Sequence, residues 1–396
     1  MAGERVARWV PAVNAMLDPA ARRARRRSAG SFDALRERAA KRSGVAQPAD
    51  PGFLADLRVL HDSFLAVPEL SFMGLVSVRT ELVRHMRNWL RVREYLRVHP
   101  EAARTPVLRP VFVVGLPRTG TTLLHSRLAS VPGHRAALMW ELLAPVPAVP
   151  AKPGQPRPGR RIRNAELLTR FSHMVAPQLR VIHPLDARAP EECVFALPHS
   201  MVYHARARMP GYLDWYAGRD ATPDYDYLRE QLQILQWGRP PCRWILKSPF
   251  HLWNLGALLR VFPDATIVWT HRDPAVAVAS WCSLAEITMT FHNLRLDLRQ
   301  LGQDWVALWA RAVTLGAESR AAAATPFLDV SYTQLCADPE SVLAEVLRAI
   351  GAPGEPSARE KVTTSPRRPH RAAHHYSLDR YGLTAEPVRA AFPAGT

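Results

Sequence analysis

The sequence predicts an α/β protein built on a doubly wound, P-loop-like parallel sheet with helices on both faces. Four short apolar segments, at residues 111–114, 243–247, 266–270 and 327–330, each end at a polar junction that is followed by a helix-compatible stretch. The first of them is apolar at every position, which is typical of a parallel strand buried on both faces. With 396 residues, 47% of them hydrophobic, the chain can bury a large core. Alternating strands and helices favour the doubly wound class.

The first strand ends in a loop suited to a phosphate or a sulfate. Gly115 and Gly120 let the backbone turn sharply around a small anion. Thr121 and Thr122 then begin a helix, whose unpaired N–H groups and partial positive charge attract anions. Arg118 adds a full positive charge, so this segment predicts an anion-binding turn.

The loop departs from the ATP-binding pattern at one position. A Walker A loop has two glycines separated by four residues, followed by Lys and then Ser or Thr. Gly115 and Gly120 have this spacing, but Thr121 stands where the lysine belongs. The sequence therefore argues against a kinase or nucleotide hydrolase, which stays open as the alternative enzyme class.

Later strand ends also carry groups suited to anions. Lys247 and Ser248 lie at the C-terminal end of the second strand, in a chain where only four of the 52 basic residues are lysines. Arg272 follows the third strand, and Ser280 lies two turns into the next helix. Because ligands of open α/β sheets bind at the carboxyl ends of the strands, we expect these groups to share one crevice with the loop.

Composition limits the partners and the compartment. The net charge is +17, but basic residues are spread along the whole chain, so we expect no nucleic-acid partner; a DNA or RNA binder is the non-enzymatic alternative. The run Arg22–Arg27 predicts a solvated helix face, with weak peripheral membrane contact as the alternative. Four scattered cysteines fit a reducing, cytoplasmic compartment. The sequence contains no run of about 18 apolar residues, so we expect no membrane span. The oligomeric state stays open.

Together these motifs resemble the sulfotransferases that use 3′-phosphoadenosine 5′-phosphosulfate (PAPS), in particular a bacterial branch with motif similarity to tyrosylprotein sulfotransferases. Residues 118–122, Arg-Thr-Gly-Thr-Thr, resemble the family's 5′-phosphosulfate loop, which adds Thr119 to the candidate donor contacts. Arg272 and Ser280 resemble its 3′-phosphate site, and Tyr332 is similarly placed to an adenine-contacting tyrosine. Lys247 resembles a lysine that steadies the leaving oxygen.

The resemblance covers about residues 105–385 and implies a domain plan. Residues 1–105 are expected to form an N-terminal helical extension, and residues 106–396 the sulfotransferase domain. An insertion at about 141–240 is expected to wall the acceptor pocket, with ordinary helical packing as the alternative for any one of its residues, such as Tyr212, Trp215 and Tyr216. A tail at about 365–385 resembles a segment that closes near the nucleotide.

The implied reaction is in-line transfer of a sulfuryl group from PAPS to a hydroxyl of a small-molecule, lipid or carbohydrate acceptor, with an amine as the second choice. Lys247 and Arg118 would stabilise charge on the leaving oxygen, and we expect no metal requirement. A base must take the acceptor proton. The base candidates, in order of preference, are Glu141, His251, and then Glu192 or His125.

Overall fold

The sheet of the computed structural model has five strands in the order β2-β3-β1-β4-β5, and every pairing is parallel. The model describes residues 5–26, 31–45, 51–147, 159–352 and 377–393. The strands are β1 Val111–Gly115, β2 His134–Arg135, β3 Arg243–Lys247, β4 Thr266–His271 and β5 Phe327–Ser331. The predicted fold class is confirmed. The sequence did not predict β2, because a strand of two residues at the edge of a sheet has no hydrophobic periodicity.

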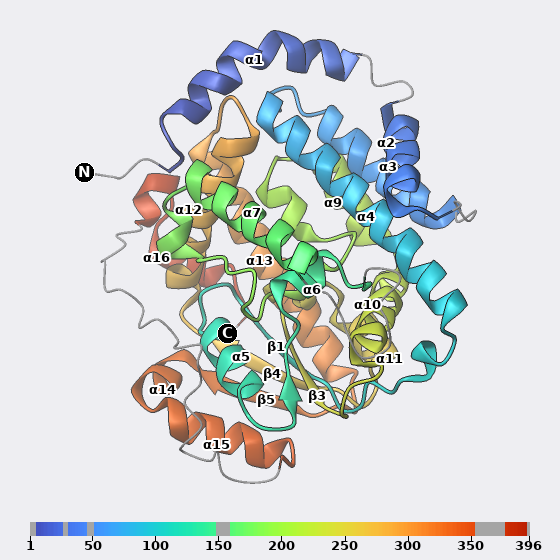
Figure 1. Ribbon diagram of the computed structural model, residues 1–396. Coiled ribbons are helices and arrows are strands. Elements are labelled where there is room, and N and C mark those ends of the chain that lie inside the picture. The colour runs from blue at the N-terminus through green and yellow to red at the C-terminus, as the bar shows by residue number, and fades with distance from the viewer. Residues whose placement is uncertain (1–4, 27–30, 46–50, 148–158, 353–376, 394–396) are drawn as a thin grey trace.

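Side chains of the central strand alternate between two cores. Val111 and Val113 join a cluster under α5 (Thr121–Ala129), α14 (Tyr332–Ala337) and α15 (Pro339–Ala349). Phe112 and Val114 join the larger cluster on the other face, with α11 (Leu255–Val261), α12 (Pro274–His292) and α13 (Leu298–Ala321). Figure 1 shows helices on both sides of the sheet. Burial on both faces explains why β1 is apolar at every position.

The N-terminal helices pack onto the main core. They are α1 (Trp9–Arg26), α2 (Ser31–Ser43), α3 (Pro51–Leu65) and α4 (Phe72–Val98), followed by a 3₁₀ turn at Ala102–Arg104. The apolar residues that recur at helical spacing along one face of α4 are buried: Leu75, Val78, Leu82, Met86 and Trp89. At Gly74 an added Cβ would lie 2.4 Å from the His292 carbonyl oxygen, so α4 and α12 approach closely where a side chain would not fit.

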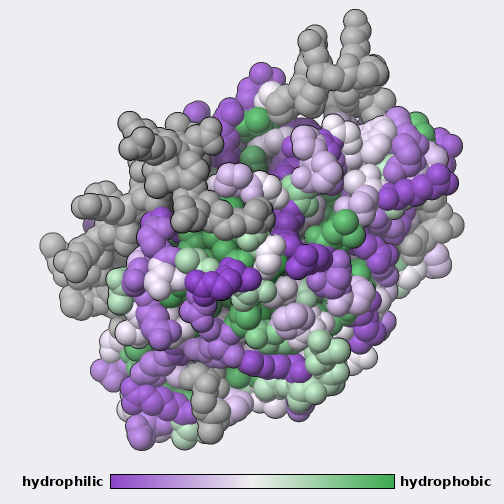
Figure 2. Space-filling model, turned by 90° about the horizontal axis from the view of Figure 1, so that it is seen from below, coloured by the Kyte–Doolittle hydropathy of each residue, from purple (hydrophilic) through white to green (hydrophobic). Residues whose placement is uncertain are grey.

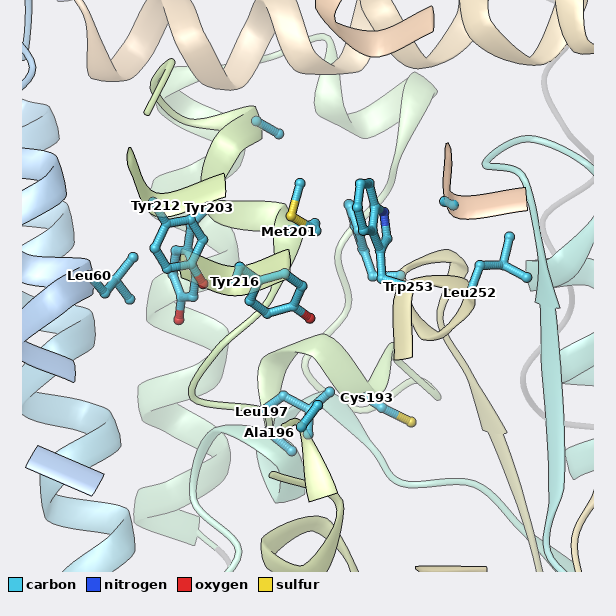
Figure 3. Packing of buried hydrophobic residues seen from close by; sticks show 14 of the residues in the cluster. Leu60, Cys193, Ala196, Leu197, Met201, Tyr203, Tyr212, Tyr216, Leu252 and Trp253 are labelled. Carbon is cyan, nitrogen blue, oxygen red and sulfur yellow. The ribbon is translucent and has the colours of Figure 1, made fainter. Parts of the chain in front are cut away.

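The region expected to wall the acceptor pocket is mainly helical. It contains α6 (Met139–Leu143), α7 (Gly159–Val175), α8 (Leu179–Ile182), α9 (Pro210–Gly218) and α10 (Thr222–Gln236), with 3₁₀ turns at Cys193–Phe195 and Met201–Ala205. Tyr212 and Tyr216 pack together deep in the core (Figure 3). The Tyr212 hydroxyl donates to the Ser200 carbonyl at 3.1 Å. These two tyrosines therefore belong to ordinary packing, the alternative left open for this region.

Two helical segments differ from the sequence expectation. The helix-compatible stretch after the strand at 243–247 begins as a 3₁₀ helix over Pro249–Asn254, which leads into α11. The Ser248 hydroxyl caps it by accepting from the Phe250 N–H at 3.3 Å. Among the described residues, one helix, α12, is long and apolar enough to cross a membrane. However, 72% of that window is buried inside the protein, as in the core helix of a compact fold.

The C-terminal residues return to the main domain. Most of the expected nucleotide-covering tail at about 365–385 lies outside the described residues. Most of the proline-rich segment 145–158, which precedes α7, lies outside them as well. From residue 377 the chain forms a 3₁₀ turn, Leu378–Tyr381, and α16 (Ala385–Ala390), which contacts α12. The face in Figure 2 carries hydrophilic residues spread around smaller hydrophobic areas.

Candidate functional site

The loop between β1 and α5 is held in a conformation that its residue types require. Gly115 has φ +139°, and a Cβ there would lie 2.4 Å from the Thr270 carbonyl oxygen. Gly120 has φ +87° and caps α5. Arg118 also has a positive φ, 70°, which is uncommon for a residue with a side chain. The loop therefore curls so that the N-terminus of α5 is presented at the carboxyl edge of the sheet, as the anion-site prediction requires.

Buried threonines fix this curl to the neighbouring strand. The Thr119 hydroxyl donates to the Leu116 carbonyl at 2.7 Å and lies 2.5 Å from the Thr270 hydroxyl of β4. Thr119 and Thr121 are buried, whereas Thr122 is exposed at the start of α5. Of the predicted loop residues, Thr122 and Arg118 are therefore the ones with side chains open to a ligand.

Arg118 links the loop to the helical region of the insertion. Its guanidinium donates to the carbonyl of Ile182, the last residue of α8, at 2.7 Å. His183 follows directly and lies 3.9 Å from the Glu191 carboxylate. The chain around α8 thus contacts the loop between β1 and α5 (residues 115–122, the phosphate loop).

Lys247 brings a buried ammonium to the same place. It ends β3, next to β1 in the sheet, and is 1% exposed. Its Nζ donates to Glu192 Oε1 at 2.6 Å and to the Thr122 hydroxyl at 3.4 Å. The Ser248 hydroxyl lies 3.4 Å from the other oxygen of Glu192. Burial by itself would raise the pKa of Glu192, but the Lys247 ammonium, with His183 and Ser248, holds that pKa below its ordinary value.

A second polar area lies at the ends of β4 and β5. A cavity of about 450 Å³ is lined by His271, Arg272, Asp273, Ser331, Tyr332 and Thr333. The Arg272 guanidinium donates to the Arg118 carbonyl at 2.8 Å and lies 3.9 Å from the centre of the Tyr332 ring. The structure therefore joins the predicted Arg272 and Tyr332 to each other and to the phosphate loop.

The C-terminal helix borders this area, whereas Ser280 is not among the residues that line the cavity. Ser280 is 1% exposed on α12, and within the described residues it makes no hydrogen bond to Arg272. Asp273 caps α12 by accepting from the Ala275 N–H at 2.9 Å. The same carboxylate pairs with Arg389 of α16 at 2.7 Å, so the end of the chain lies against the wall of the cavity.

Glu141 has structural partners. Glu141 is 1% exposed, and its carboxylate accepts from the Leu138 N–H at 3.1 Å at the start of α6 and pairs with Arg135 at 2.6 Å. Arg135 in turn lies over the Trp244 ring. No contact in the described part of the chain joins Glu141 to Lys247.

The two candidate histidines are buried and neutral. His251 is fully buried and shares a hydrogen bond of 3.0 Å between its Nδ1 and the Tyr225 hydroxyl. His125 lies 3.1 Å from the Ile245 carbonyl through its Nε2. Burial, the largest cause, lowers the pKa of each to about 3, so each imidazole has little tendency to accept a proton.

One cluster of donor atoms was not foreseen. His183, Glu191 and Glu192 place one ligand-type atom each within 4.8 Å of one another, which are residue types that bind metal ions. The Glu192 carboxylate already forms an ion pair with the Lys247 ammonium. The cluster therefore combines two carboxylates, an imidazole and an ammonium beside the phosphate loop. His183 carries no signal in the sequence, because only folding brings it to Glu191.

The arrangement gathers positive charge at the carboxyl edge of the sheet, which suits anionic ligands. The Lys247 ammonium lies beside Thr122 at the N-terminus of α5, and the Arg272 guanidinium contacts the Arg118 carbonyl of the same loop. The Glu192 carboxylate lies beside the Lys247 ammonium.

Comparison with known proteins identifies the family. A profile of the sulfotransferase family matches residues 110–356, more than half of the chain. The chain belongs to the sulfotransferase family. The match spans the phosphate loop, Glu192, Lys247, Arg272 and Tyr332.

Solved structures show the same fold over nearly the whole sulfotransferase chain. Sulfotransferase STF1 from Mycobacterium tuberculosis H37Rv superposes with a TM-score of 0.79 at 33% identity, covering 92% of this chain and 98% of that chain. Sulfotransferase STF9 from Mycobacterium avium gives a TM-score of 0.77 at 26% identity, covering 91% and 94%.

Curated relatives match part of the chain. The omega-hydroxy-beta-dihydromenaquinone-9 sulfotransferase Stf3 of Mycobacterium bovis and of Mycobacterium tuberculosis is 27% identical over 260 residues. The match covers 61% of this chain and 62% of those proteins, so the chain matches about three fifths of the relatives' length.

Proposed function

We propose that this sulfotransferase moves a sulfuryl group from PAPS to a hydroxyl of a small-molecule, lipid or carbohydrate acceptor by in-line displacement. The single observation that carries the proposal is the position of Lys247. Its ammonium lies 3.4 Å from the Thr122 hydroxyl at the N-terminus of α5, although it arrives from β3 rather than from the loop itself. The loop lacks a Walker lysine at Thr121, and a cation from another strand stands beside it.

The surroundings of Arg272, which suit a second anionic group, support PAPS as the donor rather than a simple sulfate or another nucleotide. Arg272 borders a cavity of about 450 Å³ and is held between the Arg118 carbonyl and the Tyr332 ring. An aromatic ring beside a guanidinium is suited to an adenine base near a phosphate. In this proposal Arg118, Thr119, Gly120, Thr121 and Thr122 hold the 5′-phosphosulfate, and Arg272, Ser280 and Tyr332 hold the 3′-phosphate and adenine.

The name of the relatives and the state of the cysteines support the proposed acceptor and compartment. Stf3 is named for an omega-hydroxy acceptor, which favours a hydroxyl over an amine here. All four cysteines are unpaired, which fits a reducing environment, and we place the reaction in the cytoplasm.

Calorimetric titration with 3′,5′-bisphosphoadenosine tests the donor, with ADP plus Mg²⁺ as the control. We expect tight binding of the first and weak binding of the second, because only the first carries a 3′-phosphate for Arg272. The alternative, a kinase or nucleotide hydrolase with a divergent loop, predicts the opposite order and Mg²⁺-dependent ATP turnover.

A further inference from the structure

Glu192 is held at the phosphate loop by backbone hydrogen bonds that run alongside α6. The Met139 N–H donates to the Ala189 carbonyl at 3.0 Å, and the Trp140 N–H to the Ala187 carbonyl at 3.1 Å. The Glu191 N–H completes the set by donating to the Ala137 carbonyl at 3.1 Å. This short ladder fixes the direction in which the chain enters the site, so the position of Glu192 does not depend on a free loop.

The carboxylate of Glu192 is the acidic group in direct contact with the candidate catalytic lysine. It is 13% exposed as a side chain, and its two oxygens face Lys247 Nζ at 2.6 Å and the Ser248 hydroxyl at 3.4 Å. Lys247 also reaches Thr122 at the N-terminus of α5. The Glu192 carboxylate therefore contacts the Lys247 ammonium, which in turn contacts Thr122 at the N-terminus of α5.

The other base candidates are engaged elsewhere. Both Glu141 oxygens hold local structure, one at Arg135 and one at the cap of α6. His251 and His125 are buried imidazoles bonded to Tyr225 and to a backbone carbonyl. Among the candidates, Glu192 combines partial solvent access with contact to a group at the phosphate loop.

We propose that Glu192 is the general base of the sulfuryl transfer and that Lys247 controls when it can act. This inference rests on the proposed function. The acceptor oxygen forms a bond to the donor sulfur while the bond from sulfur to the bridging phosphate oxygen breaks. The acceptor proton passes to a Glu192 oxygen, and the electron pair of the broken bond stays on the 5′-phosphate, whose charge Lys247 balances.

The pairing with Lys247 gives the base an off state. Without donor, the ammonium holds the carboxylate, and a carboxylate stabilised by a cation is a poor proton acceptor. When donor anions draw the ammonium toward the helix end, Glu192 loses that stabilisation in a largely buried position and becomes more basic. The charged or titratable groups that face it are Lys247, His183 and Glu191, with Ser248 as a hydrogen-bond partner. The buried His125, His251 and Cys193 also interact with its charge. His183, whose side chain is 28% exposed, offers the proton a way to solvent.

The test compares Glu192→Gln with Glu141→Gln, the rival base, and with Glu230→Gln as a matched control. Glu230 is a largely buried carboxylate on α10 that pairs with Arg93 of α4 and does not belong to the site. With radiolabelled PAPS and water as the acceptor, we expect Glu192→Gln to slow sulfate release by about 100-fold or more, the usual worth of a general base. Affinity for 3′,5′-bisphosphoadenosine should stay within about threefold of the parent protein. Glu192→Asp, which keeps the carboxylate, should recover part of the rate.

A proton-linkage measurement decides the matter where hydrolysis is too slow to detect. Calorimetry of 3′,5′-bisphosphoadenosine binding in buffers of different ionisation enthalpy should show proton uptake that grows from pH 7 to pH 5 in the parent protein and in Glu230→Gln, and that falls in Glu192→Gln. Unchanged sulfate release or unchanged proton uptake in Glu192→Gln overturns the inference, as does a loss of turnover confined to Glu141→Gln. Failure of the parent protein to bind the nucleotide at all would instead overturn the proposed function.

Discussion

Replacing Gly120 by alanine should separate the backbone cost of the phosphate loop from its role in nucleotide binding. Gly120 has φ +87°, where an L-residue costs about 1–2 kcal/mol. The added Cβ would also lie 2.8 Å from Leu335 Cδ2 and 3.2 Å from Tyr332 Cδ2. Leu335 is 1% exposed and cannot move into solvent, so overpacking adds about 1–3 kcal/mol.

Gly133 provides the matched control. It has φ +80° with nothing within 4 Å of an added Cβ, so Gly133→Ala carries the backbone cost without the clash. Urea unfolding should therefore show a loss of about 1–2 kcal/mol for Gly133→Ala and a larger loss for Gly120→Ala. Because the clash displaces Tyr332, only Gly120→Ala should weaken 3′,5′-bisphosphoadenosine binding, by about tenfold or more, which corresponds to about 1.4 kcal/mol. Equal losses of stability and equal nucleotide affinities in the two variants would refute this reasoning.

Three other predictions concern the second anion site, acid stability and the chain end. Arg272→Ala and Ser280→Ala should each weaken binding of 3′,5′-bisphosphoadenosine by about tenfold or more but barely change binding of adenosine 5′-phosphate; equal losses for both ligands in a titration would contradict a 3′-phosphate site. Burial lowers the pKa of His85, His125, His251 and His292 to about 3 each. In the unfolded chain these groups bind protons near pH 6.5, whereas in the folded protein they stay neutral down to about pH 3. The free energy of unfolding should therefore be largest above pH 6.5 and fall as the pH drops toward 3, by up to about 5 kcal/mol per pH unit for four groups. Urea midpoints that stay constant from pH 7 to pH 5 would exclude this. Glu286 binds Arg5, Arg380 and Tyr381 at once, so Glu286→Gln should speed proteolysis of residues 377–393, whereas Glu230→Gln should not; identical cleavage rates would show that the tail is held by other contacts.

Much of the fold could be predicted from local signals. Buried parallel strands are continuously apolar, and each junction between strand and helix carries glycine, proline or a capping residue. The strand β2 was missed because two edge residues have no period, and the 3₁₀ helix after Ser248 because its local sequence also suits an α-helix. Tyr212 and Tyr216 could not be assigned from sequence, since an aromatic residue at helical spacing suits a pocket and a core equally.

Most of the residues predicted for the donor side lie together in the structure because they adjoin recognisable junctions between strand and helix. Arg118, Lys247, Arg272 and Tyr332 each follow a strand, and parallel strands end at one edge of a sheet. For the base, the resemblance placed Glu141 first, and the fold engages its carboxylate with Arg135 and with the Leu138 N–H at the start of α6.

The sequence by itself determined the parallel sheet, the phosphate loop without its lysine, and the set of cations at the strand ends, because each depends on residues that are close in the chain. Only the tertiary structure decided which groups meet. Lys247 contacts Glu192 across 55 residues, and Arg272 contacts the loop across 154. Such contacts depend on strand order and on how the insertion packs, and no local pattern encodes either of these.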